Sequence, residues 1–212
     1  MIVPILTRPE ILYRMLHSID YPIDRLVVID NGDCVDPDRI DVNGNIRRVH
    51  LISIPSNLGV SGSWNLGIKA APFAPYWLIA NFDLVWPPGS LEALDLAARP
   101  DALVLSGASP EWSAFLLGEK VVETIGLFDE SFHPAYFEDN DYKRRAERYG
   151  VEIVRSGIPV RHYNSSTLEA GYASVNSRTF GANETYYARK IETDDFSEGR
   201  WDLNRRRDNS WD

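Results

Sequence analysis

The chain has 212 residues, of which 44% are hydrophobic and 25% charged, as in ordinary globular proteins and unlike disordered chains. This length suits one well-buried domain and is short for two independent ones. The formal net charge of −9 disfavours nonspecific binding to nucleic acid or to an anionic membrane over most of the surface.

Neither the cysteine content nor the beginning of the chain suggests export. Cys34 is the sole cysteine and cannot form an internal disulfide. Residues 1–5 lack the basic start and the apolar stretch of a secretion signal, and no apolar run is long enough to span a bilayer. We therefore expect a cytoplasmic protein without a transmembrane segment.

The first half of the chain alternates strand-like and helix-like segments. The predicted strands are residues 2–6, 26–29, 50–54 and 76–80, and the predicted helices are residues 10–19 and 61–71. This alternation is typical of βαβ units. The nearly continuous apolar run at 76–80 fits a parallel strand that is covered on both faces.

The second half has a looser pattern. It predicts helices at residues 90–98 and 138–149, and strands at 102–105, 114–117 and near 152–154. After Ser166 the pattern weakens. We predict one α/β domain over residues 1–193, with a nucleotide-binding part at about 1–100 and an acceptor and catalytic part at about 101–170. Residues 194–212 are interpreted as a polar tail or lid.

Polar residues follow three of the predicted strands. They are Thr7-Arg8, Asp30-Asn31 and Asn81-Phe82-Asp83. In open α/β sheets, ligands bind at the carboxyl ends of the strands. We therefore expect these residues to converge on a ligand site.

The densest acidic segment is Phe137-Glu138-Asp139-Asn140-Asp141, with the isolated His162 further along. Carboxylates packed this closely suit proton abstraction or metal binding. An alternative is purely structural, because acidic residues at a helix start are stabilised by the macrodipole and act as caps.

In their order and spacing, these segments resemble the large family of inverting GT-A-fold glycosyltransferases, the family-two type, and most closely its rhamnosyltransferase-like branch. No single segment is specific, but their order over residues 3–166 is. The matching segments are Leu6-Thr7-Arg8-Pro9, Asp30-Asn31, Asn57-Leu58-Gly59, Asn65-Leu66-Gly67, Asn81-Phe82-Asp83, Gly126-Leu127-Phe128-Asp129-Glu130, Glu138-Asp139-Asn140-Asp141 and His162 with Ser165-Ser166.

The resemblance implies a GT-A (nucleotide-diphospho-sugar transferase) fold, with a Rossmann-like, mostly parallel sheet flanked by helices. It also implies a metal-dependent hexosyltransferase or rhamnosyltransferase. Such an enzyme moves a sugar from a uridine or thymidine diphosphate donor to an acceptor hydroxyl with inversion. The acceptor stays open between a glycan, a lipid-linked sugar, a protein and a modified nucleobase.

A divalent cation, Mn²⁺ or Mg²⁺, is the implied cofactor, because hard cations take oxygen ligands. By resemblance, Asp83 belongs to an Asp-x-Asp metal motif in which Asn81 replaces the first acid. His162 resembles the third residue of the metal site and could ligate the ion or contact the diphosphate. The alternatives are that Asp83 only terminates a strand and that His162 is structural.

By resemblance, Asp139 is the general base that takes the proton of the acceptor hydroxyl. Glu138, Trp112 and Tyr136 are implied on the acceptor side, where flat rings could stack against a sugar or a base. Core packing is the more common fate of such aromatics. For Asp141 we expect a structural role.

The implied donor-binding residues surround the nucleotide. They are Thr7, Arg8, Asp30, Asn57, Gly59, Asn65 and Asn81. Asp30 would accept the imide N–H of uracil or thymine, although an Asp before Asn-Gly is equally a turn signal. Gly59 could equally shape a turn into a helix.

A function of a different class also fits, namely a non-catalytic nucleotide-sugar-binding protein of the same fold. The joint presence of Asp83, Asp139 and His162 weakens this alternative. Turnover of the donor would separate the two.

Overall fold

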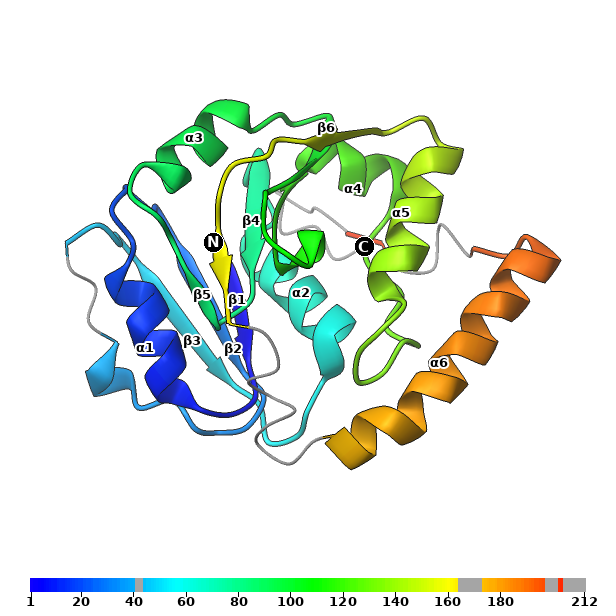
Figure 1. Ribbon diagram of the computed structural model, residues 1–212, viewed down its shortest axis with the longest axis horizontal. Coiled ribbons are helices and arrows are strands. Elements are labelled where there is room, and N and C mark those ends of the chain that lie inside the picture. Colours follow the sequence, from blue (N-terminus) through cyan, green and yellow to red (C-terminus); the bar gives the residue numbers. More distant parts are fainter. Residues whose placement is uncertain (41–43, 164–172, 197–201, 204–212) are drawn as a thin grey trace, which may run out of the picture.

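The structure is a computed structural model that describes residues 1–40, 44–163, 173–196 and 202–203. Its centre is a 7-stranded sheet with the order β3-β2-β1-β4-β7-β6-β8 (Figure 1). The strands are β1 Ile2–Ile5, β2 Leu26–Asp30, β3 Val49–Ser53, β4 Tyr76–Ala80, β6 Ala102–Leu105, β7 Ala114–Gly118 and β8 Glu152–Arg155. Adjacent strands are parallel except where β7 pairs antiparallel with β4 and β6.

Helices cover both faces of the sheet. Their bounds are α1 Pro9–His17, α2 Gly59–Ala70, α3 Ser90–Ala97, α4 Glu119–Ile125, α5 Glu138–Arg148 and α6 Ala173–Thr193. Residues of α1 and α3 pack in one hydrophobic cluster, and residues of α2, α4 and α5 in another. Successive strand residues divide between the two clusters, Ile2 in one and Val3 in the other, because side chains alternate across a strand. The predicted mostly parallel sheet flanked by helices is confirmed.

A second, smaller sheet connects distant parts of the chain. The strands β5 Leu84–Val85 and β9 Arg161–His162 pair antiparallel, with Leu84 opposite His162. The pairing continues past β5, since the backbone N–H of Tyr163 donates to the carbonyl of Asp83 at 2.9 Å. This short ladder places the residue before β5 beside the residue that ends β9.

The predicted long strands and helices are present, but within the described ranges two α-helices, α4 and α6, two short strands, β5 and β9, and the short 3-10 turns were not predicted. Helix α6 was not predicted because its buried positions include the polar residues Asn183 and Lys190, so the sequence shows no apolar stripe with helical spacing. Phe196, at the start of the predicted polar tail, is buried. Ser165, Ser166 and most of residues 194–212 lie outside the described ranges.

Within the described ranges, we find no helix with the length and apolar character needed to cross a bilayer.

Candidate active site

The carboxyl ends of β1, β2 and β4 meet at one edge of the sheet. Strand β1 pairs in parallel with both β2 and β4. Thr7 and Asn81 follow β1 and β4, and Asp30 ends β2. The structure thus brings these three predicted positions to the same edge, where ligands of open α/β sheets bind.

Asp83 and His162 lie in direct contact. Nε2 of His162 is 2.9 Å from Oδ1 of Asp83, and Nδ2 of Asn81 is 3.3 Å from the same ring nitrogen. Both the aspartate and the histidine side chain are only 8% exposed. The β5–β9 ladder is the reason for this contact, because it places the two backbones side by side.

The other nitrogen of the His162 ring faces two serines that the sequence did not single out. Nδ1 lies 3.2 Å from Oγ of Ser113 and 3.2 Å from the carbonyl oxygen of Ser109. A carbonyl only accepts, so a hydrogen bond to Ser109 requires the proton to be on Nδ1. In a neutral imidazole the Nε2 lone pair then faces both the carboxylate of Asp83 and the amide of Asn81, and a cation or a further proton between Nε2 and Oδ1 would stabilise their contact.

The donor set around Asp83 and His162 fits a divalent cation. Two neighbouring ligands of an octahedral ion at about 2.1 Å from the metal are about 3 Å apart, which matches the separation of Oδ1 and Nε2. Within the described residues, no group of three or more His, Cys, Asp or Glu side chains is arranged so that it could hold a metal ion. Mg²⁺ and Mn²⁺ sites commonly use few protein ligands and complete their shell with phosphate and water.

Glu138 and Asp139 form the first turn of α5, where the helix macrodipole favours carboxylates. Burial raises the pKa of Glu138 to about 8, and the nearby charge of Asp139 adds to this rise. Oε2 of Glu138 is buried and has no hydrogen-bond partner within the part of the chain that the structure describes. Burial also raises the pKa of Asp139, whose Oδ1 accepts the N–H of Asn140 at 2.8 Å. Asp139 is therefore a half-buried carboxyl group next to a second carboxyl group, Glu138, that holds its proton at neutral pH.

Asp141 has the structural role that we expected. Its side chain is fully buried, and its carboxylate lies 2.9 Å from Nε of Arg145 and 2.5 Å from Nζ of Lys190. Arg145 also donates to the carbonyls of Ile125 and Leu127, which ties α5 to the end of α4.

Trp112 bridges the two parts of the site. It lies in a short 3-10 turn, Glu111–Ser113, immediately before the serine that faces His162. Its ring centre is 4.9 Å from that of Phe115 and 6.5 Å from that of Tyr142, which lies one turn into α5. Trp112 is half-buried and packs against the hydrophobic cluster that includes residues of α5.

Tyr136 packs against α6 rather than against Trp112. Its ring centre is 5.4 Å from that of Phe180, and the side chain is half-buried. This contact fits the alternative that the Tyr136 ring serves packing and not acceptor binding. The backbone of Tyr136 is unusual, with a φ of 79°.

Asp30 is fully buried and serves the turn that follows β2. Its carboxylate accepts the backbone N–H groups of Gly32 at 3.1 Å, Cys34 at 2.9 Å and Val35 at 2.8 Å. Gly32 is required here because a Cβ would lie 2.0 Å from the carbonyl oxygen of Leu6. A nucleobase could reach the Asp30 carboxylate only if this turn opened, so the turn role is the one that the geometry supports.

Asn57 and Gly59 shape the turn into α2. Oδ1 of Asn57 accepts the N–H of Gly59 at 2.8 Å. Gly59 has a φ of 73°, and a Cβ there would lie 2.8 Å from the carbonyl oxygen of Pro134. The backbone N–H of Val60 donates to the carbonyl of Pro134 at 2.8 Å, and this hydrogen bond joins the turn to the loop that leads into α5.

Asn65 lies in the buried scaffold between α2 and the segment before α5. It is fully buried, and its amide donates to the carbonyl of Phe128 and to Oε1 of Glu130, both at 2.8 Å. Its Oδ1 accepts the N–H of Phe128 at 2.9 Å. The side chain thus fastens α2 to the segment before α5, and a direct nucleotide contact does not fit this position.

Thr7 and Arg8 lie where β1 turns into α1. Both are half-buried. Arg8 has a left-handed backbone with a φ of 59°, and its Nε lies 3.3 Å from Oε1 of Glu10. The two residues remain at the edge where the donor is expected.

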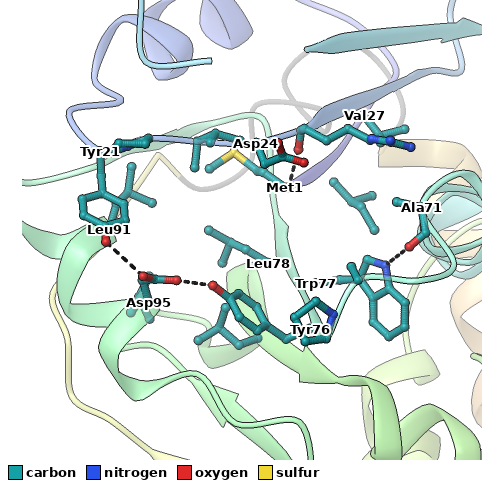
Figure 2. A pocket seen from close by; sticks show the side chains of 18 of the residues that line it. Met1, Tyr21, Asp24, Val27, Ala71, Tyr76, Trp77, Leu78, Leu91 and Asp95 are labelled. Atoms are coloured by element: carbon teal, nitrogen blue, oxygen red, sulfur yellow. Dashed lines mark hydrogen bonds between the residues drawn. The ribbon is translucent and has the colours of Figure 1, made fainter. Parts of the chain in front are cut away.

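A cavity of about 430 Å³ opens at the opposite end of the sheet (Figure 2). It lies at the amino ends of β1 and β4, beside Ile2 and Tyr76. Asp95 of α3 accepts hydrogen bonds there from the hydroxyls of Tyr21, at 2.9 Å, and Tyr76. Because strands β1 and β4 separate this cavity from the residues above, it does not belong to the candidate active site.

Comparison with known sequences identifies the family. The model of "Glycosyl transferase family 2" matches residues 1–117, a segment that contains Asp83 and ends before Glu138 and His162. A galactofuranosyl glycosyltransferase of Leishmania donovani is 32% identical over 82 residues. That alignment covers 38% of this chain and 18% of the relative, so the chain matches less than a fifth of that protein.

Solved structures show the same fold at low sequence identity. The mannosyltransferase PcManGT from Pyrobaculum calidifontis, in complex with GDP-Man and Mn²⁺, has a TM-score of 0.65 at 15% identity over 90% of this chain and 63% of its own. Residues 1–349 of TarS from S. aureus have a TM-score of 0.57 at 16% identity over 76% of this chain and 59% of that fragment. GalNAc-T7 with UDP, GalNAc and Mn²⁺ has a TM-score of 0.61 at 10% identity over 76% of this chain and 43% of its own. The chain has the GT-A fold and belongs to glycosyl transferase family 2.

Proposed function

We propose that this chain transfers a sugar from a uridine or thymidine diphosphate donor to an acceptor hydroxyl, with inversion and with Mn²⁺ or Mg²⁺ as cofactor. The transferred group would be a hexose or rhamnose. The observation that carries the proposal is the contact of Asp83 with His162 at the carboxyl edge of the sheet, at 2.9 Å. Family membership supports sugar transfer, and the Mn²⁺ complexes of two structural neighbours support a metal.

On the donor side, Asp83 and His162 would hold the cation, which stabilises negative charge on the departing diphosphate when it is bound. Ser109 and Ser113 orient the imidazole so that Nε2 faces Asp83. Such partners of a metal-binding histidine set its tautomer and orientation. The side-chain amide of Asn81 faces Nε2 of His162, so Asn81 also lies beside the proposed cation position.

On the acceptor side, Asp139 would take the proton of the attacking hydroxyl. A hydroxyl is a poor nucleophile at neutral pH, so a carboxylate within hydrogen-bond reach is needed. Glu138, with a pKa of about 8, carries a proton at neutral pH and can donate a hydrogen bond to an acceptor oxygen. The half-buried Trp112 would offer a flat surface for a sugar ring.

For the donor base, we assign recognition to the turn after β2 and not to the Asp30 carboxylate itself. That carboxylate already accepts three backbone N–H groups and shapes residues 32–35. Thr7 and Arg8 would line the same pocket from the end of β1. Among the neighbours, PcManGT is in complex with GDP-Man and TarS with UDP, so the nucleotide needs a direct test.

That test is a panel of nucleotide sugars screened for thermal stabilisation with and without Mn²⁺. A ligand at a hundredfold excess over its Kd stabilises the native state by about 2.7 kcal/mol. We expect a uridine or thymidine diphosphate sugar to stabilise the protein in a Mn²⁺-dependent manner and to be slowly hydrolysed, with a chelator abolishing both effects. Stabilisation without any turnover, even with a range of acceptors, would instead indicate a nucleotide-sugar-binding protein.

A further inference from the structure

The loop that leads into α5 has an unusual backbone. Tyr136 and Phe137 have φ values of 79° and 72°, in the left-handed region that L-residues with a side chain avoid. Such conformations persist only where the surrounding structure holds them, and they often occur at functional sites. Glu138 and Asp139 follow directly, so the position of the proposed base depends on how these two residues are held.

Helix α6 contacts these same residues. Nδ2 of Asn183 donates to the carbonyl of Ala135 at 2.8 Å and reaches that of Tyr136 at 3.4 Å. The ring of Phe180 lies 5.4 Å from that of Tyr136 and 5.1 Å from that of Phe137, measured between ring centres. Figure 1 shows α6, in orange, running along the outside of the molecule beside α5. The contacts of α6 are therefore made with the loop before α5, on the side away from the central sheet.

One buried ammonium fastens both ends of this loop. Nζ of Lys190 lies 2.7 Å from Oδ2 of Asp129, before the loop, and 2.5 Å from Oδ1 of Asp141, after it. Lys190 is only 3% exposed. Tyr186 also donates to Oδ2 of Asp129, at 2.9 Å. Arg145 also pairs with Asp141. The buried carboxylates of Asp129 and Asp141 therefore face two cations, Lys190 and Arg145, and the charges balance.

From these contacts, we infer that α6 is a positioning element of the active site, in which Asn183 and Lys190 hold the loop at 130–137 so that Asp139 is presented to the acceptor. Apolar side chains would suffice if α6 only covered the loop, since buried ion pairs rarely stabilise a fold more than apolar packing does. Buried hydrogen bonds to the carbonyls of particular residues instead specify one backbone conformation. This inference rests on the proposed function, because it takes Asp139 as the base.

The test compares Asn183→Ala with Thr185→Ala, a matched control on the same helix. Thr185 is exposed, and its hydroxyl bonds within α6. For Asn183→Ala we expect faster amide exchange at residues 133–141 and a fall in kcat for donor turnover of about tenfold or more, since small displacements of a reacting group can cost about 10²-fold. The Kd for the best nucleotide sugar of the panel with Mn²⁺ should not change, and Thr185→Ala should behave as the wild type.

Lys190 provides a second arm. Lys190→Met removes the buried charge, whereas Lys190→Arg keeps it. We therefore expect kcat to fall in Lys190→Met and to fall less in Lys190→Arg. If Lys190→Met or Asn183→Ala fails to fold, Phe180→Ala replaces it, because that ring is 41% exposed and its loss is tolerable. Phe180→Ala is likewise expected to lower kcat and to speed exchange of the loop without changing donor Kd.

Asp139→Asn, measured in the same series, separates the proposed role of Asp139 as the base from the inferred role of α6 as a positioning element. Normal turnover by Asp139→Asn would overturn the proposed base, whatever α6 does. An inactive Asp139→Asn together with unchanged kcat or unchanged loop exchange in Asn183→Ala would overturn the inference about α6 and leave the proposed function intact.

Discussion

Oδ1 of Asp83 and Nε2 of His162 lie 2.9 Å apart, although the two residues are separated by 79 positions in the chain. The two-stranded ladder of β5 and β9 causes this proximity, and the Ser109 carbonyl opposite Nδ1 orients the ring. A carboxylate and an imidazole nitrogen held together in this way would supply two ligands to the proposed cation. The central part of the proposal depends on this contact.

Replacing Asp83 by Asn should weaken Mn²⁺-dependent binding of the nucleotide sugar by at least about tenfold, equivalent to about 1.4 kcal/mol. The amide keeps the size of the side chain and a hydrogen bond to His162, but it lacks the charge that holds a cation. Calorimetric titration with and without Mn²⁺ would measure this effect. Asp101→Asn, an exposed aspartate paired with Arg99, is the control. Equal Mn²⁺ dependence in both variants would remove Asp83 from the metal site.

Asp139→Asn should bind the donor normally and lose most turnover. The amide preserves shape and hydrogen bonding but cannot take a proton, and general base catalysis contributes about 10²- to 10⁴-fold. Slow hydrolysis of the donor, or transfer once an acceptor is known, provides the readout, with donor Kd as the internal control. Near-normal turnover would rule out Asp139 as the base.

Glu138→Gln should change how stability depends on pH. The pKa of Glu138 is raised from 4.5 to about 8 in the folded protein, so the native state binds more protons than the unfolded state between these values. Its contribution to the free energy of unfolding is therefore fully present below the unfolded pKa and is lost as pH rises through the folded pKa. Gln does not titrate, so the variant should gain stability relative to the wild type as pH rises, by a few kcal/mol in order of magnitude.

Urea denaturation at about pH 4, 6 and 9 would follow this difference. The two proteins should differ least at the lowest pH, and the variant should have its largest relative advantage at the highest. A constant difference across the range would mean that Glu138 does not titrate abnormally.

Asp30→Asn should lower stability by about 1 to 3 kcal/mol, because the introduced amide group faces backbone N–H groups that need an acceptor. Asp33→Asn, in the same turn but exposed, should be neutral. Chemical denaturation of both variants measures the difference. Unchanged stability of Asp30→Asn, combined with a lost preference for pyrimidine nucleotides, would restore Asp30 as the reader of the base.

The sequence was sufficient for the central sheet because its strands are apolar runs separated by helical segments. It was not sufficient for β5 and β9, which are two residues long and carry no periodicity. The role proposed for His162 came from family resemblance, and only the ladder explains its contact with Asp83. Nothing in the sequence around Ser109 and Ser113 predicted their position beside His162, because each contacts the imidazole ring through a single atom.

Buried polar residues account for most of the differences from expectation. Asp30 and Asn65 were placed in the nucleotide pocket by resemblance, whereas the structure uses their polar atoms to hold backbone segments together. For Asp30, the following Asn31-Gly32 had already indicated a turn. Helix α6 was missed for a related reason, since Asn183 and Lys190 are buried through hydrogen bonds and ion pairs and not through apolar packing.

The most direct test of the proposed metal site is a crystal structure with Mn²⁺ and the nucleotide that stabilises the protein best, with anomalous scattering used to locate the metal. We expect one manganese peak at about 2.1 to 2.3 Å from both Oδ1 of Asp83 and Nε2 of His162, bridged to the diphosphate. A nucleotide bound at the carboxyl edge of the sheet, with manganese located elsewhere or with no manganese bound, would contradict the proposal.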